Sequence, residues 1–376
     1  MKVLQRYFGS EIIRAVLFVL FALLVLTSFF DLMKELAAIN KNGYLLKHAL
    51  LTVLLNIPGN AYDFLPIAVL IGTIYVLAQF ASNSEFTIMR AASMSSWTVA
   101  KMLGNIAIIF ILLTYLLGEV IAPMATKLSK QISMQAASSP LTQGFRSGLW
   151  TKDLIRSNDA DGAVIGTRFL NVREVSPERT LLGVKIYEFD TNFQLLREIN
   201  AKQAVYVRSH VWQLHEVVET SFPKNLATET MIESDTHKLA TKDLMSEITP
   251  DILSVLFTEV DRMSALELAS YTKHLAENKQ STERYDIAFW KKLTYPISIL
   301  VMMALALPFA YLHARDGGIS LRIFSGIMLG MVFYLVNSLF AYLGQINTWP
   351  ALVTALFPSL IFSLLAYVGL RYVERH

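Results

Sequence analysis

The sequence predicts a membrane protein with six transmembrane helices and an all-β jelly-roll or sandwich domain inserted between helices 3 and 4. Bulk composition is the first observation: 54% of residues are hydrophobic and only 17% are charged, with a mean hydropathy of +0.44. Six apolar runs are long enough to cross a bilayer, which needs roughly 20 predominantly apolar residues. A long polar segment with strand-like patterning separates the third run from the fourth.

The six apolar runs are three before the polar segment and three after it. The last two are the clearest, because residues 323–370 contain no charged side chain, which is enough for two spans and a turn. The turn is GQINTWP, whose Gly, Asn and Pro favour a reversal of the chain. The predicted spans cover residues 11–30, 61–81, 100–122, 293–312, 323–343 and 350–370.

The basic residues near the span ends predict the orientation. The first run is too long for a signal peptide and ends in Phe29, Phe30 and Asp31 rather than in small residues. Cytoplasmic loops carry an excess of Lys and Arg. If successive spans cross the membrane in alternating directions, nine such residues lie on the same side of the membrane as the N-terminus. Both termini are therefore expected in the cytoplasm, and the polar insertion outside. The nine residues are Lys2, Arg6, Arg14, Arg90, Lys101, Arg315, Arg322, Arg371 and Arg375.

The inserted segment has the composition of a water-soluble domain. Residues 127–286 contain 19 Lys or Arg against 22 Asp or Glu. Short β-branched and aromatic runs at 163–172, 181–190, 204–220 and 227–234 predict strands of an antiparallel sandwich or jelly-roll. Such a sheet either protects its edges or pairs one with a partner's sheet. Residues 264–278 have helical spacing. The predicted domains are 1–125, 126–262 (β domain), 263–285 (connector helix) and 286–376.

A short polar segment, residues 82–97, lies between the second and third spans. Ser82, Asn83 or Ser84 can cap a helix, and Glu85 falls in the first turn, where a carboxylate complements the helix dipole. Phe86, Met89 and Arg90 follow at the spacing of one helical face. Two interpretations stay open: a linker with Trp97 at the lipid interface, or a cytoplasmic helix that receives mechanical input from a soluble partner.

The chain contains no recognisable catalytic motif. It has no G-x-x-x-x-G-K-[ST] loop for ATP phosphates, no G-x-S-x-G and no H-E-x-x-H. His210 and His215 are five residues apart in strand-like sequence, which places them on opposite faces and disfavours a metal pair. No catalytic residue, metal site, cofactor or nucleic-acid partner is expected, and any energy source must belong to a partner.

Lysines and small residues are the remaining candidates for function. Lysines at the outer ends of the spans either extend to lipid phosphates or form a site for an anionic headgroup that carries several phosphates. The residues concerned are Lys34, Lys41, Lys127, Lys130 and Lys292. Gly326 and Gly330 form a G-x-x-x-G pair, with Ser325 alongside, that permits close approach of another helix. A helix contact between subunits is one use of that pair.

Several motifs together resemble the LptG branch of the LptF/LptG permease family, which serves lipopolysaccharide export in Gram-negative bacteria. The resemblance covers nearly the whole chain, and GLWTKD is more similar to LptG than to LptF. The motifs are LQRYFG at Leu4, Pro58 with Pro66, SEFTIMRAAS at Ser84, GEVIAP at Gly118, GLWTKD at Gly148, RYDIAFWKKLTYPISILVMM at Arg284 and GIMLGMVFYLVNSLF at Gly326.

This resemblance implies a transport subunit in the inner membrane, paired with an LptF-like permease and an LptB-like ATPase dimer that uses ATP and Mg. Lipopolysaccharide would leave the outer leaflet for a periplasmic β-jellyroll bridge formed with LptC and LptA. The implied ATPase-coupling residues are Glu85, Phe86, Met89 and Arg90, and the implied subunit interface includes Ser325, Gly326 and Gly330. A basic residue typical of span 1 in the family aligns with Asp31, and Lys34 follows about one helical turn later.

Two alternatives to this prediction are kept. The sister subunit LptF would preserve the mechanism. A membrane-anchored scaffold for periplasmic proteins would perform no transport and would have no use for a docking helix at residues 82–97.

Overall fold

Six helices of the computed structural model are long and apolar enough to cross a membrane, as the sequence predicts. They are Gln5–Leu36, Leu46–Ser82, Trp97–Ser133, Glu283–Ala310, Ser320–Ile346 and Ala351–Tyr372. The structure describes residues 2–37, 39, 44–83, 85, 96–136, 147–157, 164–176, 180–208, 210–222, 235–255, 258–310 and 319–375. Each helix extends beyond its predicted apolar run, because polar residues at a membrane surface can continue a helix whose core is apolar.

The N-terminal spans are α1 (Lys2–Leu36), α2 (Leu46–Ser82) and a third span of three consecutive segments. These are α4 (Ser96–Leu116), the π-helical η1 (Leu117–Ile121) and α5 (Ala122–Ala136). With 37 residues, α2 is about 55 Å long. Pro58 and Pro66 lie inside it, and each removes one helical hydrogen bond from the backbone.

Among the C-terminal spans, the fourth is interrupted by 3₁₀ turns, whereas the fifth and sixth are continuous α-helices. The fourth span is α8 (Glu283–Thr294), η4 (Tyr295–Ile297), α9 (Ser298–Ala306) and η5 (Leu307–Ala310). The two 3₁₀ turns contain Pro296 and Pro308, which cannot donate the hydrogen bonds of a continuous α-helix. The last two spans are α10 (Ile319–Ile346) and α11 (Ala351–Arg375).

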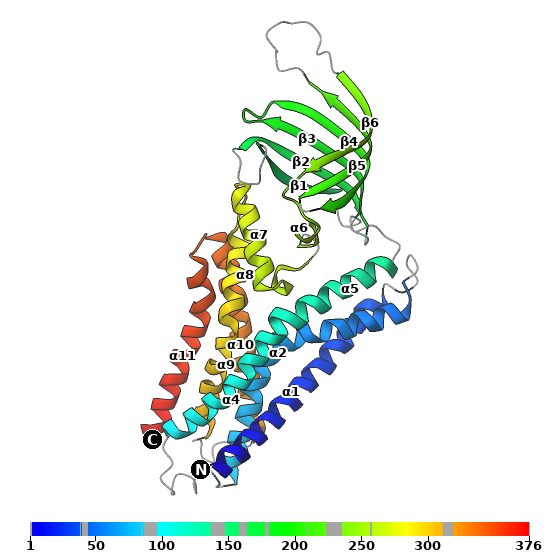
Figure 1. Cartoon of the computed structure of the whole chain (residues 1–376). Helices are drawn as coiled ribbons and strands as arrows, with labels where there is room; N and C mark the ends of the chain where they lie inside the picture. Colours follow the sequence, from blue (N-terminus) through cyan, green and yellow to red (C-terminus); the bar gives the residue numbers. More distant parts are fainter. Residues whose placement is uncertain are drawn as a thin grey trace.

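The helix bundle is organised around α2, whose residues Leu65, Leu70 and Ile74 are fully buried. Figure 1 shows α1, α2 and α5 inclined away from α8 to α11, with both termini at one end and the β-sheet at the other. Close helix contact occurs at Gly72 of α2, where an added Cβ would lie 2.7 Å from the backbone nitrogen of Val16. Larger residues at this position would therefore separate α1 from α2.

The inserted domain is a single antiparallel sheet in the order β1-β2-β3-β4-β5-β6. Its strands are β1 (Leu149–Arg156), β2 (Val164–Val175), β3 (Thr180–Asp190), β4 (Leu195–Arg208), β5 (Val211–Ser221) and β6 (Asp235–Met245). The predicted strand 204–220 is two strands, separated by a turn at His210, whose φ of +61° is left-handed. The predicted strand 227–234 lies outside the described residues.

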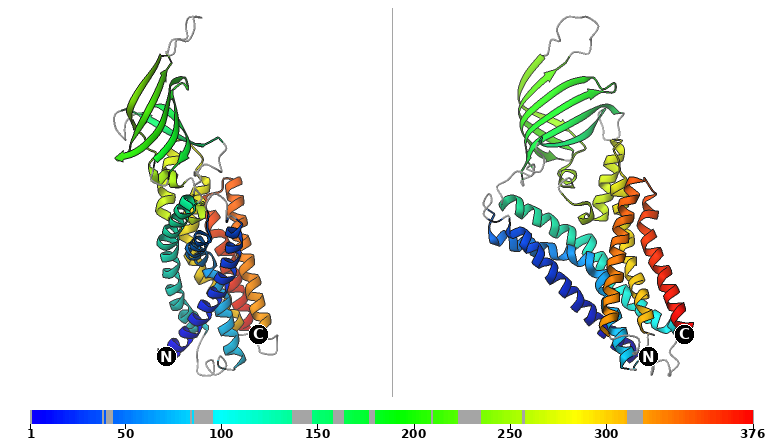
Figure 2. Two further views of the ribbon diagram at one scale, coloured as in Figure 1. Left: turned by 90° about the vertical axis from the view of Figure 1, so that its right-hand side faces the viewer. Right: turned by 180° about the vertical axis from the view of Figure 1, so that it is seen from behind.

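A jelly-roll or a two-sheet sandwich is not confirmed in the described residues. The six strands instead form one curved sheet, seen from two further sides in Figure 2. The curvature brings the two ends of the sheet together: Ser246 Oγ donates to Asp153 Oδ2 at 2.7 Å, and Arg168 Nη1 donates to the Met245 carbonyl at 2.6 Å. One sheet thus encloses an apolar core that includes Trp212.

Three short helices connect the sheet to the fourth span. They are α6 (Pro250–Val255), η3 (Val260–Arg262) and α7 (Ala265–Glu277), and α7 matches the predicted connector 264–278. Ser264 begins α7 with a capping box, because its side chain accepts from the Glu267 N–H and the Glu267 carboxylate accepts from the Ser264 N–H. Within the predicted β domain of 126–262, strands occupy only 149–245, since α5 continues to Ala136.

Candidate functional site

A polar cavity of about 260 Å³ lies where α2, η3, α8 and α10 meet. It lies on the side of the bundle that carries the sheet. Its walls are formed by Tyr62, Asp63, Pro66, Ile67, Glu259, Val260, Asp261, Arg262, Leu268, Ala288, Lys291, Lys292, Tyr295, Phe333, Tyr334, Asn337 and Ser338.

Arg262 joins the connector to α2 at this cavity. Its Nη2 lies 2.9 Å from Asp63 Oδ2 and donates to Asn60 Oδ1 at 3.1 Å. Asn60 and Asp63 are three residues apart, so one face of α2 presents both acceptors. Gly59 leaves space for the guanidinium, because a Cβ at this position would collide with it. The Tyr295 hydroxyl donates to the Asp63 carbonyl at 2.7 Å, which also joins η4 to α2.

The same polar chain extends to α1. Asn60 Nδ2 donates to Asp31 Oδ2 at 2.9 Å, and Lys34 Nζ lies 3.8 Å from Asp31 Oδ1. Asp31 and Lys34 therefore form an ion pair between residues one helical turn apart in α1. The Lys34 side chain is 79% exposed, which leaves its ammonium available to an external anion.

Lys292 is in a different environment. The residue is only 6% exposed, and its Nζ lies over the ring of Tyr62, 4.6 Å from the ring centroid. Tyr62 in turn packs against Tyr295, with 4.9 Å between ring centroids. Lys291, its neighbour, points to Asp261 at 3.5 Å.

The third span contacts the connector through two of its side chains, Glu119 and Lys127. Glu119, in η1, accepts from the Ala265 N–H at 2.9 Å, at the beginning of α7. Lys127 forms an ion pair with Glu267. Burial raises the pKa of the Glu267 carboxyl, but the hydrogen bonds and charge of Lys127 and the Ser264 cap outweigh this and hold the pKa below its usual value.

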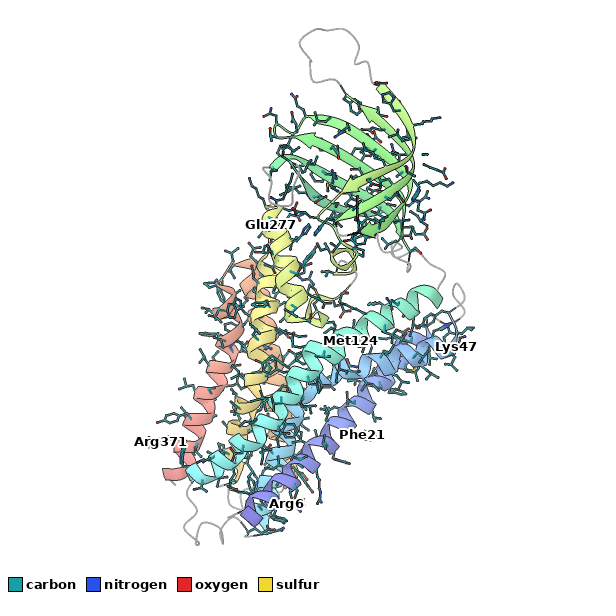
Figure 3. The ribbon with its side chains drawn as sticks, viewed as in Figure 1. Arg6, Phe21, Lys47, Met124, Glu277 and Arg371 are labelled. Atoms are coloured by element: carbon teal, nitrogen blue, oxygen red, sulfur yellow. The ribbon has the colours of Figure 1, made fainter. Side chains whose placement is uncertain are left out.

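The sheet is attached to α7 by a further group of polar contacts. Lys152 Nζ donates to the Asn278 carbonyl at 2.9 Å, and Arg156 pairs with Glu247 at 2.6 Å and with Glu277 at 3.7 Å. Figure 3 shows Glu277 at the upper end of α7, beneath the sheet. His274, one turn earlier, is buried, and burial lowers its pKa.

The predicted phosphate-binding lysines do not form one group. Lys34 and Lys130 are exposed, Lys127 is held by Glu267, and Lys292 is enclosed in the cavity. Lys41 lies outside the described residues. The connector nevertheless lies close to three of them. Arg262 donates to Asn60, which contacts the partner of Lys34; Glu267 pairs with Lys127; and η3 forms part of the wall of the cavity that holds Lys292.

The predicted coupling segment begins where α2 ends, at the opposite end of the bundle from the sheet. Glu85 is described and accepts from Asn83 Nδ2 at 3.3 Å; Phe86, Met89 and Arg90 lie outside the described residues. Arg6 and Arg371 lie at this end of the molecule in Figure 3. The assignment of these residues to ATPase coupling stays a prediction.

The glycine pair of α10 does permit a close helix contact, and within this chain the contacting helix is α2. A Cβ at Gly326 would lie 2.8 Å from Ile74 Cδ1, and one at Gly330 would lie 3.0 Å from Ile67 Cγ2. Ser325 Oγ donates to the carbonyl of Arg322 at 2.8 Å in the same helix. The predicted subunit interface at these residues stays a prediction, and the exposed apolar side of α10 is the part left open to a partner.

Sequence reasoning singled out Glu119 as a polar residue within span 3 but missed the other residues that join the connector to the bundle, namely Arg262, Asn60 and Asp63. One signal was present for two of them, since Asn60 and Asp63 interrupt an apolar run between Pro58 and Pro66, and polar residues within a span are commonly functional. Arg262 carried no such signal. In the parts of the chain that the structure describes, no group of three or more His, Cys, Asp or Glu could hold a metal ion.

Comparison with known proteins decides the family. The family model "Lipopolysaccharide export system permease LptF/LptG" matches residues 6–372. The chain belongs to this family. It is 30% identical to the lipopolysaccharide export system permease protein LptG of Escherichia coli strain K12, over 97% of this chain and 96% of the relative. The LptG of E. coli O6:H1 strain CFT073 gives the same values. The LptG of Haemophilus influenzae strain Rd is 28% identical, over 97% of both chains.

Membership in the LptF/LptG family agrees with the six spans and with the sheet between helices 3 and 4. It identifies a multi-pass permease of the inner membrane and is consistent with a transport subunit rather than an enzyme. The three LptG relatives favour the LptG branch.

Proposed function

We propose that this chain is the LptG-type permease subunit of an ATP-driven exporter that extracts lipopolysaccharide from the outer leaflet of the inner membrane. The observation that carries the proposal is the family match over residues 6–372, together with relatives that cover nearly the whole chain. The subunit pairs with an LptF-like permease. An LptB-like ATPase dimer supplies the energy, and the cargo passes to a periplasmic β-jellyroll bridge formed with LptC and LptA.

The arrangement of the chain supports this division of roles. Both termini and the end of α2, which precedes Glu85 in the chain, lie at one end of the bundle, and the sheet lies at the other (Figure 1). The basic side chains Arg6 and Arg371 are at the end with the termini (Figure 3), which the positive-inside rule assigns to the cytoplasm. On this orientation the ATPase docks at Glu85, Phe86, Met89 and Arg90, and the sheet is periplasmic.

The exposed lysines at the outer ends of the spans bind the phosphates of the cargo. Lys34 projects its ammonium to solvent from α1, and Lys130 is exposed on α5; Lys41 completes the set. Lysine recognises phosphate as a point charge and needs no fixed geometry. Lys127 joins them only when it leaves Glu267, so its contribution is smaller. Apolar faces of α1, α2 and α10 accommodate the acyl chains.

The contacts of the connector with α2 support transmission of motion between the two ends. Arg262 links η3 to Asn60 and Asp63, and Asn60 links onward to Asp31 of α1. A displacement of α2 driven from its Glu85 end therefore moves the connector that carries the sheet. The polar chain is the physical basis of coupling between ATP hydrolysis and the periplasmic domain.

The test is the composition of the complex purified gently from native membranes. We expect one homologous permease and two ATPase subunits to copurify with this chain. Glu85→Lys should lose the ATPase while the chain stays in the membrane, and Ser82→Ala, whose hydroxyl donates to the Ala78 carbonyl within α2, serves as the control. Recovery of the chain without any ATPase, or full ATPase recovery with Glu85→Lys, would contradict the respective part of the proposal.

A further inference from the structure

Among the charged residues that line the polar cavity between α2, η3, α8 and α10, one cation and one anion form no direct salt bridge within the described residues. Arg262 pairs with Asp63 at 2.9 Å, and Lys291 pairs with Asp261 at 3.5 Å. Among the described residues, neither Lys292 nor Glu259 has a salt bridge within 4.0 Å, although both line the cavity. Lys292 and Glu259 are therefore the charges in the cavity wall that are available to a ligand.

Lys292 requires a compensating anion more than the other lysines do. Burial of an ammonium that forms no salt bridge is strongly unfavourable, and Lys292 is only 6% exposed. The cation–π contact with Tyr62 returns only part of this cost. The carboxylates of Glu119 and Asp63 attract the ammonium from beyond salt-bridge distance, and Arg262 repels it. A bound anion in the cavity would remove most of this cost.

A second, half-buried polar group faces the same space. Asn337 is an amide in the middle of an apolar helix and lines the cavity. It makes no hydrogen bond to any residue in the described part of the chain. Polar residues within a span mark ligand sites when no protein partner satisfies them. An amide supplies both a donor and an acceptor, which suits the phosphate and ester oxygens of a lipid.

We propose that this cavity binds the zwitterionic phosphoethanolamine headgroup of a membrane phospholipid, with its phosphate on Lys292 and its ammonium toward Glu259. The order of the two groups matches the bilayer. Lys292 is within the fourth span, whereas Glu259 is exposed and precedes η3, outside the spans. A phospholipid places its phosphate nearer the acyl chains than its amine, so both charges meet their complements.

Size and charge favour this ligand over the phosphorylated disaccharide of the cargo. A cavity of about 260 Å³ is below the roughly 300–1,000 Å³ of sites that hold drug-sized molecules, so it takes a headgroup only. A ligand with two phosphates would also meet three carboxylates, on Asp63, Glu259 and Asp261. Tyr334 and Ser338, one helical turn apart, are exposed where they line the cavity, so the acyl chains lie along the outside of α10.

This inference goes beyond the proposed transport function and stands independently of it. The test is native mass spectrometry of the full chain in detergent, titrated with dioleoyl phosphatidylethanolamine, dioleoyl phosphatidylglycerol or lipid A. We expect phosphatidylethanolamine to bind best. Lys292→Gln should weaken this binding about tenfold, the loss of one charge-assisted contact. Lys273→Gln is the matched control and should change binding less than about twofold, since Lys273 is 79% exposed on α7, pairs with Glu277 at 3.9 Å and does not line the cavity.

Glu259→Gln separates a zwitterion site from a simple phosphate site. The side chain is exposed, so this variant keeps the fold even where a change at Lys292 disturbs it. We expect it to weaken phosphatidylethanolamine and leave phosphatidylglycerol unchanged, which removes the preference between the two lipids. Equal binding of both lipids to the unmodified chain would overturn the proposal. Displacement of phosphatidylethanolamine by equimolar lipid A would also overturn it, because the cavity would then be a cargo site.

Discussion

Arg168→Met should destabilise the β-sheet domain strongly. Arg168 lies between two buried carboxylates, 3.2 Å from Asp153 Oδ2 and 2.9 Å from Glu188 Oε1, whose side chains are 0% and 3% exposed. Removal of one partner of a buried ion pair costs about 3–5 kcal/mol. Arg197 still pairs with Glu188 at 2.9 Å, and Ser246 still donates to Asp153. These contacts place the expected loss near the lower limit, at about 3 kcal/mol.

The loss should depend on pH in a defined direction. Burial raises the pKa of the Asp153 carboxyl above its usual value, despite the opposing charge of Arg168. Removal of Arg168 raises it further, so the folded sheet binds a proton more tightly than the unfolded chain does. Lowering the pH through this raised pKa therefore returns part of the stability. Arg168→Met should be most damaging at neutral pH and less so in mild acid.

Amide hydrogen exchange of the full chain measures this effect, because exchange in the strand core reports local unfolding. A loss of about 3 kcal/mol corresponds to roughly 10²-fold faster exchange in β2 and β3. Arg208→Met is the matched control: its partner Asp243 is 4.0 Å away and the Arg208 side chain is 73% exposed, so exchange should rise less than about fivefold. Equal rates for the two variants would refute the assignment of a structural role to the buried network.

Three further predictions concern the connector. Ser264→Ala removes the α7 cap and should cost about 1 kcal/mol, measured as a lower thermal midpoint; an unchanged midpoint would exclude the cap. Arg262→Met should keep the chain folded but weaken coupling, seen as ATPase activity that no longer responds to cargo; normal response would remove Arg262 from the coupling route. His274 has a pKa lowered by burial, so the unfolded chain takes up the proton first, and stability should fall as pH drops below about 6.5. His274→Gln should flatten that dependence, and an identical pH profile would contradict it.

The transmembrane helices could be predicted because hydropathy directly reflects the solvent around each segment. Residues 323–370 contain no charge, and the structure has α10 and α11 there. The breaks in the fourth span follow from Pro296 and Pro308. The ends of the spans were harder to predict, because a helix continues beyond its apolar run: α2 begins at Leu46, whereas the predicted span begins at residue 61.

The form of the β domain could not be predicted from strand patterning alone. Alternation of apolar and polar residues indicates that one face is buried, but it is the same whether a second sheet covers that face or the sheet curves over itself. The contacts that distinguish the two are long-range, such as Asp153 with Ser246. The split of 204–220 into β4 and β5 rests on the backbone at His210, which adopts a positive φ without a glycine.

The polar site shows the same limit at the level of single residues. Lys292 was singled out by sequence as a phosphate ligand, yet its enclosure over Tyr62 depends on how α2 meets α8. In the sequence, Arg262 resembles the other charged residues of a soluble segment. Only the structure shows that it contacts Asp63 of the membrane-spanning helix α2. Interactions between segments some 200 residues apart have no local sequence signal.

The central claim, that this chain serves ATP-driven export of lipopolysaccharide, is tested most directly by transport in proteoliposomes. The chain would be reconstituted with the permease and ATPase subunits that copurify with it, and labelled lipopolysaccharide would be followed to a soluble periplasmic acceptor. We predict release that requires ATP and this chain and that Glu85→Lys abolishes. Release of the same amount without ATP, or without this chain, would contradict the claim.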